Sequence, residues 1–244
     1  PAAAAAAITS KTRAIVPVDL FGQVAAVEEV SRVAKGIPVI EDAAQSIGAR
    51  REINGQWRAA GEMATIGTFS FFPSKNLGGY GDGGAAVTQD EGLFREMMRL
   101  RTHGGTQTYR HEVVGYNSRL DALQAAVLMA KLPYLSQWSE KRRANAAYYD
   151  GAFEDVPEVT GPYIEPVSES VFNQYTIRVP RRDDLRAHLR AEGIGHSVYY
   201  PIPLHLQPCF AHLDYTSGQC PESERAAQEV VSLPIYPELT LEQL

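Results

Sequence analysis

The 244-residue sequence has little of several features that mark whole classes of protein. Two cysteines, Cys209 and Cys220, are too few for a disulfide framework, so we expect a reducing compartment, the cytoplasm. Its only long uncharged stretch near the start, 1–10, is too short to span a bilayer and lacks a basic segment, so we expect neither a membrane helix nor a signal peptide. The formal net charge is −6 without a basic run, which argues against nucleic-acid binding.

The glycine-rich stretch 78–84 also lacks the known nucleotide-binding fingerprints. It contains no G-K-[ST] and no G-x-G-x-x-G that opens a helix after a strand. We therefore interpret it as a flexible turn that lets a neighbouring lysine reach inward. An unrelated nucleotide-binding α/β protein stays an alternative, and no metal site is expected.

Strands and helices alternate through the first part of the chain. Short apolar runs predict strands at 14–18, 38–41, 64–71 and 85–88, and helical spacing predicts helices at 24–35 and 91–101. This alternation is typical of an α/β fold with a mostly parallel sheet wrapped by helices. In such sheets ligands bind at the carboxyl ends of the strands.

The second part of the chain has a different texture. Two helices are predicted at 121–131 and 135–153, separated at Pro133, and prolines become frequent after residue 156. A strand at 174–179, a helix at 182–192 and a strand at 198–200 follow. We therefore divide the chain into part of a large domain, 1–135, and a linking helix with a small α+β domain, 136–244. Because the sequence has no initiator methionine and leads at once into a strand, we expect it to be part of a longer chain.

Two polar residues follow predicted strands. Asp42 ends the apolar run that begins at Ile37, and Lys75 follows an aromatic run. An amine and a carboxylate at two strand ends are the protein groups that pyridoxal phosphate chemistry needs: the lysine binds the cofactor covalently, and the carboxylate keeps the pyridine nitrogen protonated. Each has an ordinary alternative, since Asp42 can cap a helical turn and Lys75 can be a solvent-exposed lysine. Ser70 can bind the cofactor phosphate or be an ordinary strand serine.

Together with these residues, several separated blocks resemble one known family. They are residues 8–23, Glu41-Asp42-Ala43-Ala44-Gln45, Leu100-Arg101-Thr102-His103-Gly104, Gly115-Tyr116-Asn117-Ser118-Arg119-Leu120-Asp121, residues 199–205 and Leu233-Pro234-Ile235-Tyr236-Pro237. The chain resembles the DegT/DnrJ/EryC1/StrS family of sugar aminotransferases, which depend on pyridoxal 5'-phosphate and have the aspartate aminotransferase fold, fold type I. The resemblance runs from about Ile8 to the last residue.

The resemblance implies a role for each matching residue. Lys75 binds the cofactor and later moves the proton, Asp42 pairs with the pyridine nitrogen, Gln45 reaches the ring near its phenolic oxygen, and Ser70 binds the phosphate. Asn117 reaches the cofactor phosphate of the neighbouring subunit, which implies a homodimer with shared active sites. Candidate sugar-nucleotide contacts are His103, Tyr109, His111, Arg119 and His205. For each histidine, a packing or surface role is an equal alternative.

The sequence departs from the family pattern at its start. Members of the family have a long preceding segment, which supplies a Gly-Thr pair for the phosphate and a residue that stacks on the cofactor ring. Neither is recognisable in residues 1–14. We therefore expect that the amino-terminal part of the large domain lies outside this sequence.

The implied reaction moves an amino group from an amino acid, expected to be glutamate, to a nucleotide-linked keto-sugar. Two alternatives share the fold. Sugar dehydratases among the relatives carry histidine at the lysine position, so Lys75 argues against that activity. A regulatory protein that keeps the fold without the chemistry is the other alternative, and the presence of Asp42, Gln45, Ser70 and Lys75 argues against it.

Overall fold

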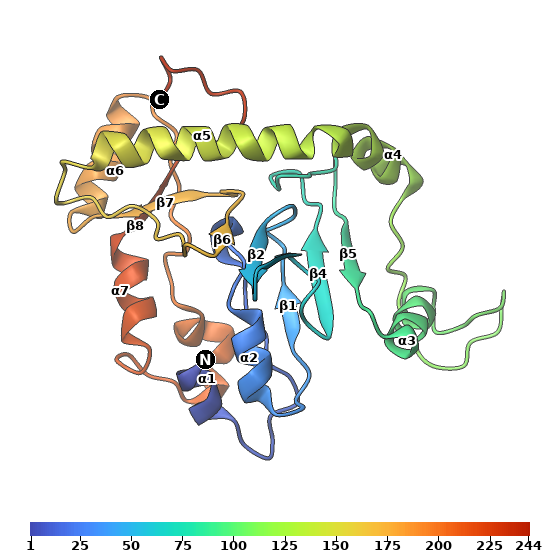
Figure 1. The fold of residues 1–244 in the computed structure, drawn as a ribbon. Helices are drawn as coiled ribbons and strands as arrows, with labels where there is room; N and C mark the ends of the chain where they lie inside the picture. The colour runs from blue at the N-terminus through green and yellow to red at the C-terminus, as the bar shows by residue number, and fades with distance from the viewer. The chain divides into compact units, whose positions relative to one another are not determined.

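The computed structural model describes residues 1–244, and the chain forms two compact units (Figure 1). Unit 1 comprises Pro1–Glu140 and Ile164–Asn173, and unit 2 comprises Lys141–Tyr163 and Gln174–Leu244. The division expected from sequence, 1–135 and 136–244, differs in that unit 1 extends to Glu140 and residues 164–173 return to it. They return because this segment supplies both a strand and a core residue to unit 1.

The central sheet of unit 1 has the strand order β1-β4-β5. β1 (Ile40–Asp42) and β4 (Ile66–Ser70) are parallel, with Asp42 opposite Thr68, whereas β5 (Gly84–Val87) is antiparallel to β4. The sheet is therefore mixed, with β5 as an antiparallel strand at its edge, within the α/β fold expected from sequence. The predicted strand at 14–18 is reduced to two parallel bridges, Ile15 to Val39 and Val18 to Asp42.

A second sheet in unit 1 has the order β3-β2-β6 and was not foreseen from sequence. β2 (Arg50–Ile53) and β3 (Gln56–Ala59) form a hairpin, and β6 (Ser168–Glu169) pairs antiparallel with β2. The hairpin carries few β-branched residues, so its sequence gives a weak strand signal. Arg51, which is buried in β2, forms ion pairs with Glu28 and Glu165 and so links three distant segments.

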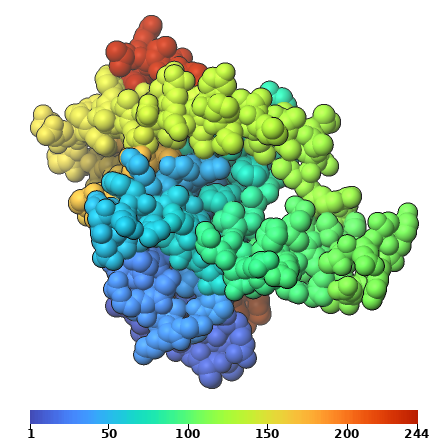
Figure 2. Space-filling model, turned by 45° about the vertical axis from the view of Figure 1, so that its right-hand side comes forward, coloured from blue at the N-terminus to red at the C-terminus, as the bar shows by residue number.

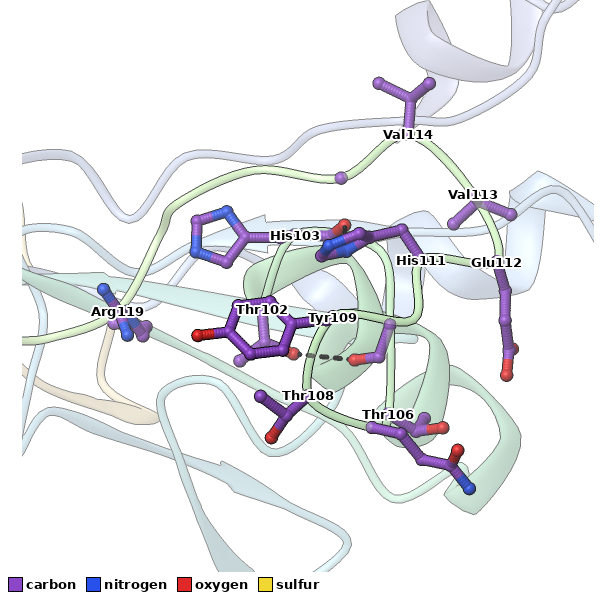
Figure 3. A pocket seen from close by; sticks show the side chains of 13 residues that line it. Thr102, His103, Thr106, Thr108, Tyr109, His111, Glu112, Val113, Val114 and Arg119 are labelled. Carbon is purple, nitrogen blue, oxygen red and sulfur yellow. Dashed lines mark hydrogen bonds between the residues drawn. The ribbon is translucent and has the colours of Figure 1, made fainter.

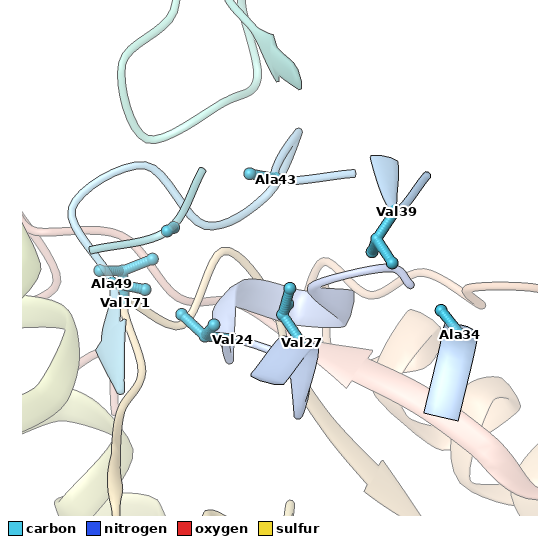
Figure 4. Packing of buried hydrophobic residues seen from close by; sticks show 8 residues of the cluster. Val24, Val27, Ala34, Val39, Ala43, Ala49 and Val171 are labelled. Carbon is cyan, nitrogen blue, oxygen red and sulfur yellow. The ribbon is translucent and has the colours of Figure 1, made fainter. Parts of the chain in front are cut away.

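The main core of unit 1 is built from small aliphatic side chains (Figure 4). Val24 lies just before α2, Val27 is its first residue, Val39 precedes β1, and Val171 comes from the returning segment. Val27 and Val171 are fully buried, and burying such a side chain stabilises a fold by about 1.5–3 kcal/mol. The core thus joins segments that lie far apart in the sequence.

The helices of unit 1 largely agree with the sequence pattern. Its helical elements are α1 (Ala2–Ala7), η1 (Leu20–Gly22), α2 (Val27–Ala34), α3 (Glu91–Arg101), α4 (Ala122–Lys131), η2 (Leu132–Tyr134) and the start of α5 (Leu135–Phe153). α3 covers the predicted range, with the Asp90 side chain accepting a hydrogen bond from the Leu93 amide at 2.8 Å. α2 begins three residues later than expected, at Val27 rather than Val24.

Unit 2 contains the rest of α5, a two-stranded sheet and several helices. Its elements are β7 (Tyr175–Arg178), α6 (Arg182–Ala191), η3 (Leu204–Leu206), η4 (Pro208–Leu213), α7 (Pro221–Glu229) and β8 (Val230–Leu233). β7 and β8 are antiparallel. The predicted strand at 198–200 is not formed, and a single bridge from Ser197 to Ser232 lies beside it. None of the helices in the structure combines the length and apolar character that crossing a bilayer requires.

Gly22 lies close to the backbone of residues 172 and 173 in unit 1. Its φ is +104°, and a Cβ atom there would lie 2.9 Å from the backbone nitrogens of Phe172 and Asn173. Gly36 has a similar φ of +92° but open space around it. Alanine at position 36 would therefore introduce backbone strain alone, whereas alanine at position 22 would introduce both backbone strain and steric overlap.

We predict that Gly22→Ala destabilises the protein by about 3 kcal/mol, because strain and overlap add. Gly36→Ala, the matched control, should cost about 1 kcal/mol from strain alone. Urea unfolding of both variants measures the difference. Equal losses for the two variants would contradict the close packing of residues 171–173 on Gly22.

Candidate active site

The parallel pairing of β1 and β4 brings two of the predicted site residues to the same edge of the sheet. Asp42 is the last residue of β1, and Ser70 is the last residue of β4. Because Asp42 stands opposite Thr68 in a parallel register, the ends of the two strands lie side by side. This edge is where ligands bind in α/β sheets.

Lys75 lies in a turn just beyond the end of β4. Its backbone N–H donates to the Phe72 carbonyl at 2.9 Å, and the Gly79 N–H donates to the Phe71 carbonyl at 2.8 Å. Leu77, which is 3% exposed, packs in a cluster with Leu128 of α4 and Leu135 of α5. The lysine therefore projects from a loop that is anchored in a core.

The glycine-rich stretch is held by two side chains of α4. Gln124 accepts a hydrogen bond from the Tyr80 amide at 2.7 Å, and the Lys131 ammonium donates to the Gly78 carbonyl at 2.7 Å. A Cβ atom on Gly78 would lie 2.4 Å from the Pro73 carbonyl oxygen. The interpretation of this stretch as a flexible turn therefore needs correction, because Gly78 allows close backbone packing.

The amine of Lys75 has an environment unlike that of a surface lysine. Burial lowers its pKa from the ordinary value, and the Asp42 carboxylate partly opposes this shift. The opposing effect means that Asp42 lies within electrostatic reach of the Lys75 amine. The two groups that the sequence singled out are therefore brought together, and a larger fraction of Lys75 is the free amine at neutral pH than for an ordinary lysine.

The polar side chains near Lys75 and Asp42 also accept hydrogen bonds from backbone amides. Asp42 Oδ1 accepts from the Ala44 amide at 3.1 Å, and Ser70 Oγ accepts from the Phe72 amide at 3.3 Å. Gln45 Oε1 accepts from the Phe21 amide at 2.7 Å, so the amide nitrogen of Gln45 is its donor end. The turn-capping role considered for Asp42 is thus present, and a carboxylate keeps further lone pairs for a ligand.

Two buried acids behind Asp42 were not recognised from sequence. Asp19 and Glu41 are both fully buried. Asp19 accepts hydrogen bonds from the Ser46 hydroxyl at 2.7 Å and the Ala25 amide at 2.8 Å, and Glu41 accepts from the Gly61 amide at 2.8 Å. Burial, with a smaller contribution from the charge of Asp19, raises the pKa of Glu41 to about 8. The alternation of β1, in which Asp42 points away from the core, was the one available signal that Glu41 points into it.

The predicted substrate contacts other than His205 lie in the segment that follows α3. Residues 102–119 form an irregular loop that stands out from the rest of unit 1 (Figures 1 and 2). The side chains of His103, Tyr109 and Arg119 extend to one side of this loop, and Val114 points away (Figure 3). They line an open cavity of about 1180 Å³ together with His111. Lys75 and Asp42 do not line this cavity.

Asn117 and His205 occupy different surroundings. Asn117 is exposed, pairs with Thr102 across a bridge and accepts a hydrogen bond from Arg119 Nε at 3.1 Å. His205 lies in unit 2, where its Nε2 is 3.1 Å from Glu224 Oε1 and its side chain is 9% exposed. Hydrogen bonds, the largest from the Gly218 amide, lower the pKa of Glu224 to about 2. The substrate roles of these residues stay predictions.

Comparison with known proteins places the whole chain in one group. The model of the DegT/DnrJ/EryC1/StrS aminotransferase family matches residues 1–244. A protein of Geobacillus stearothermophilus named "Pleiotropic regulatory protein" is 51% identical over 100% of this chain and 65% of its own length. The UDP-N-acetyl-3-dehydro-alpha-D-glucosamine 3-aminotransferase of Acidithiobacillus ferrooxidans is 47% identical over 98% of this chain and 63% of its own length.

A solved structure has the same fold. DesV of S. venezuelae, crystallised in complex with a ketimine intermediate, superposes with a TM-score of 0.93 and is 42% identical, covering 98% of this chain and 64% of DesV. The expectation of fold type I is confirmed by this likeness. The chain spans about two thirds of the length of the curated relatives that it matches, 65% and 63% for the two above.

We predict that Asp42→Asn lowers the pKa of Lys75 further, because the carboxylate that opposes the burial effect is removed. The pH dependence of labelling of Lys75 by an amine-reactive ester, followed by mass spectrometry, measures the shift. Asp82→Asn, an exposed carboxylate of the same glycine-rich stretch, is the control and should leave the profile unchanged. A profile that does not move in Asp42→Asn would show that the two groups are not neighbours.

We predict that Glu41→Gln flattens the dependence of stability on pH. The pKa of Glu41 is raised from 4.5 to about 8, so between these values the folded protein holds a proton that the unfolded chain releases. Stability of the wild type therefore falls as pH rises through this window, by at most about 1.4 kcal/mol per pH unit from this group.

Urea unfolding at about pH 5 and about pH 8 compares the two proteins. Glu62→Gln is the control, because Glu62 is exposed and its pKa is lowered by its hydrogen bond to Arg58. Identical pH slopes for the wild type and Glu41→Gln would disprove the buried, protonated state of Glu41.

Proposed function

The chain belongs to the DegT/DnrJ/EryC1/StrS aminotransferase family, and we propose that it provides the lysine and carboxylate of a pyridoxal-phosphate-dependent sugar aminotransferase. The observation that carries this proposal is the partly desolvated amine of Lys75 within electrostatic reach of the Asp42 carboxylate, beside the ends of two parallel strands. The solved relatives of this fold include proteins crystallised with pyridoxal or pyridoxamine phosphate.

The donor set fits pyridoxal 5'-phosphate. An amine with a lowered pKa is a usable nucleophile toward an aldehyde, and a carboxylate at a strand end suits a protonated pyridine nitrogen. We assign the phosphate to the Ser70 hydroxyl and the phenolic oxygen to the amide nitrogen of Gln45, whose orientation the Phe21 amide fixes. When bound, the cofactor supplies an electron sink for the carbon that loses its proton.

Lys75 and Asp42 would have different roles in the reaction. Lys75 would hold the cofactor and, once the incoming amino group has displaced it, would act as a free amine that takes a proton from the donor's α-carbon and later gives it back. Its lowered pKa increases the fraction of free base available at neutral pH. Asp42 keeps the ring nitrogen protonated throughout.

We further propose the substrates and the assembly. The acceptor is a nucleotide-linked keto-sugar, because relatives named for such acceptors are 47% and 43% identical to this chain. The amino donor is an amino acid, glutamate, which the name of a 33% identical relative contains. The 102–119 cavity, with His103, Tyr109, His111 and Arg119, would contact the sugar nucleotide. Since Lys75 does not line that cavity, we propose that this loop and Asn117 serve the site of a second subunit in a homodimer. His205 is a further candidate contact.

A regulatory role is the second candidate, because the relative with 51% identity is named a regulatory protein. The two free thiols, Cys209 and Cys220, suit a reducing cytoplasm in either case. Fold alone does not decide between an enzyme and a regulator, so the test must address the site.

We predict that Lys75→Ala abolishes the visible absorbance of lysine-bound pyridoxal phosphate and lowers amino transfer by about 10³-fold or more. The protein is expressed from its complete gene and mixed with pyridoxal phosphate, glutamate and a panel of keto-sugar nucleotides. Lys141→Ala, which removes an exposed lysine of α5, is the control.

The outcomes separate the candidates. Near wild-type turnover in Lys75→Ala would refute the assignment of Lys75. Cofactor binding by the wild type without amino transfer from glutamate would favour the regulatory role.

A further inference from the structure

Two buried asparagines connect the lysine loop to a segment almost a hundred residues away. Asn76, which directly follows Lys75, and Asn173, the last residue of unit 1, are each 7% exposed. Asn76 Nδ2 donates to the Val171 carbonyl at 2.9 Å, and Asn173 Nδ2 donates to Asn76 Oδ1 at 2.9 Å. Neither residue was singled out by the sequence analysis, and the function proposed above gives neither a role.

The Val171 carbonyl, at one end of this chain of hydrogen bonds, fixes which side-chain atoms donate and which accept. A backbone carbonyl can only accept, so the nitrogen of Asn76 must face Val171, and its oxygen must face Asn173. The nitrogen of Asn173 must then face Asn76, and its oxygen Oδ1 is left buried without a hydrogen-bond partner. Leaving a buried acceptor unpaired costs about 1–3 kcal/mol, which offsets part of the stability that the two hydrogen bonds contribute.

The segment that receives these bonds is itself fixed on the opposite side. The Val171 amide donates to the Gly22 carbonyl at 3.0 Å, and Gly22 touches the backbone of residues 172 and 173. The neighbouring Phe21 amide holds Gln45 Oε1. Asn76 is therefore linked, through residues 171–173 and 21–22, to the loop that carries Gln45.

The backbone around Lys75 is held on both sides. Before it, the Phe72 carbonyl accepts from the lysine's own amide, and after it come Asn76 in the amide pair and Leu77 in the apolar cluster. The partly buried side chain of Lys75 extends from this held backbone. A catalytic group that must act at two atoms in turn depends on such fixed supports, since a displacement of about 1 Å can lower a rate by about 10²-fold.

We propose that Asn76 and Asn173 act as a positioning pair that holds the Lys75 amine in its partly buried place beside Asp42. The purpose of this pair rests on the proposed function, whereas the experiment that tests the pair does not depend on it. The two asparagines touch neither the substrate nor the reacting atoms in this scheme. They act through the backbone that carries Lys75.

The test measures the reactivity of the Lys75 amine in protein without cofactor. The rate of labelling of Lys75 by an amine-reactive ester is followed against pH by mass spectrometry for the wild type, Asn173→Ala, Asn76→Ala and the double variant. The control is Asn145→Ala, since Asn145 is a similarly buried asparagine of unit 2 that donates to the Tyr236 carbonyl at 2.9 Å. Unfolding of each protein in urea is measured alongside.

We expect Asn173→Ala to slow the labelling of Lys75 at neutral pH by about threefold or more, as water reaches the amine and the profile moves toward that of an ordinary lysine. Asn76→Ala should do the same, and the double variant should match the single ones because the two side chains act as one pair. Asn145→Ala should lose stability without moving the profile. The rate at which pyridoxal phosphate attaches to Lys75 should fall in the same variants.

An unmoved profile in folded Asn173→Ala would overturn the proposal, as would an equal shift in Asn145→Ala. If Asn76→Ala does not fold, Asn173→Ala still decides, because it retains the bond from Asn76 to Val171. A wild type that fails to bind pyridoxal phosphate would refute the proposed function, whereas the labelling profile of the cofactor-free protein would still test the positioning pair.

Discussion

The candidate site depends on the parallel register of β1 and β4. β1 is only three residues long, and its alternation sends Glu41 into the core and Asp42 toward the strand end that faces Lys75. A slip of one residue would exchange these two acids, and the buried one would then stand in the site. The hydrogen bond from the Gly61 amide to Glu41 holds this register, and Gly67 permits it because a Cβ there would lie 2.5 Å from the Cα of Gly61.

Both units bury polar groups. In unit 2, Tyr149 donates to the Pro234 carbonyl and Tyr175 donates to Asp150, and burial lowers the pKa of Arg142 to about 10. In unit 1, burial raises the pKa of Glu41 and lowers that of Lys75, which are arrangements that cost stability. Such costs are common where a protein binds or reacts, and Glu41 and Lys75 both lie beside Asp42, at the position proposed for the site.

Membership of the family does not by itself decide between an enzyme and a regulatory protein. Proteins named as aminotransferases and one named as a regulator share this fold at 47% and 51% identity. A fold positions groups at the ends of its strands, and the groups themselves decide whether chemistry follows. Here the amine, the carboxylate and the asparagine-supported loop are all present, so the site favours an enzyme over a scaffold.

The local elements, and the lysine and carboxylate proposed for the site, could be predicted from the sequence. The period of α3, the helix break at Pro133 and the strand that leads to Lys75 were legible because they depend on neighbours along the chain. Tertiary structure alone decided the direction of β5 beside β4, the return of residues 164–173, and the pairing of Asn76 with Asn173. These depend on which distant backbones meet, and residues that lie far apart in the chain leave no periodic pattern from which such a meeting can be predicted.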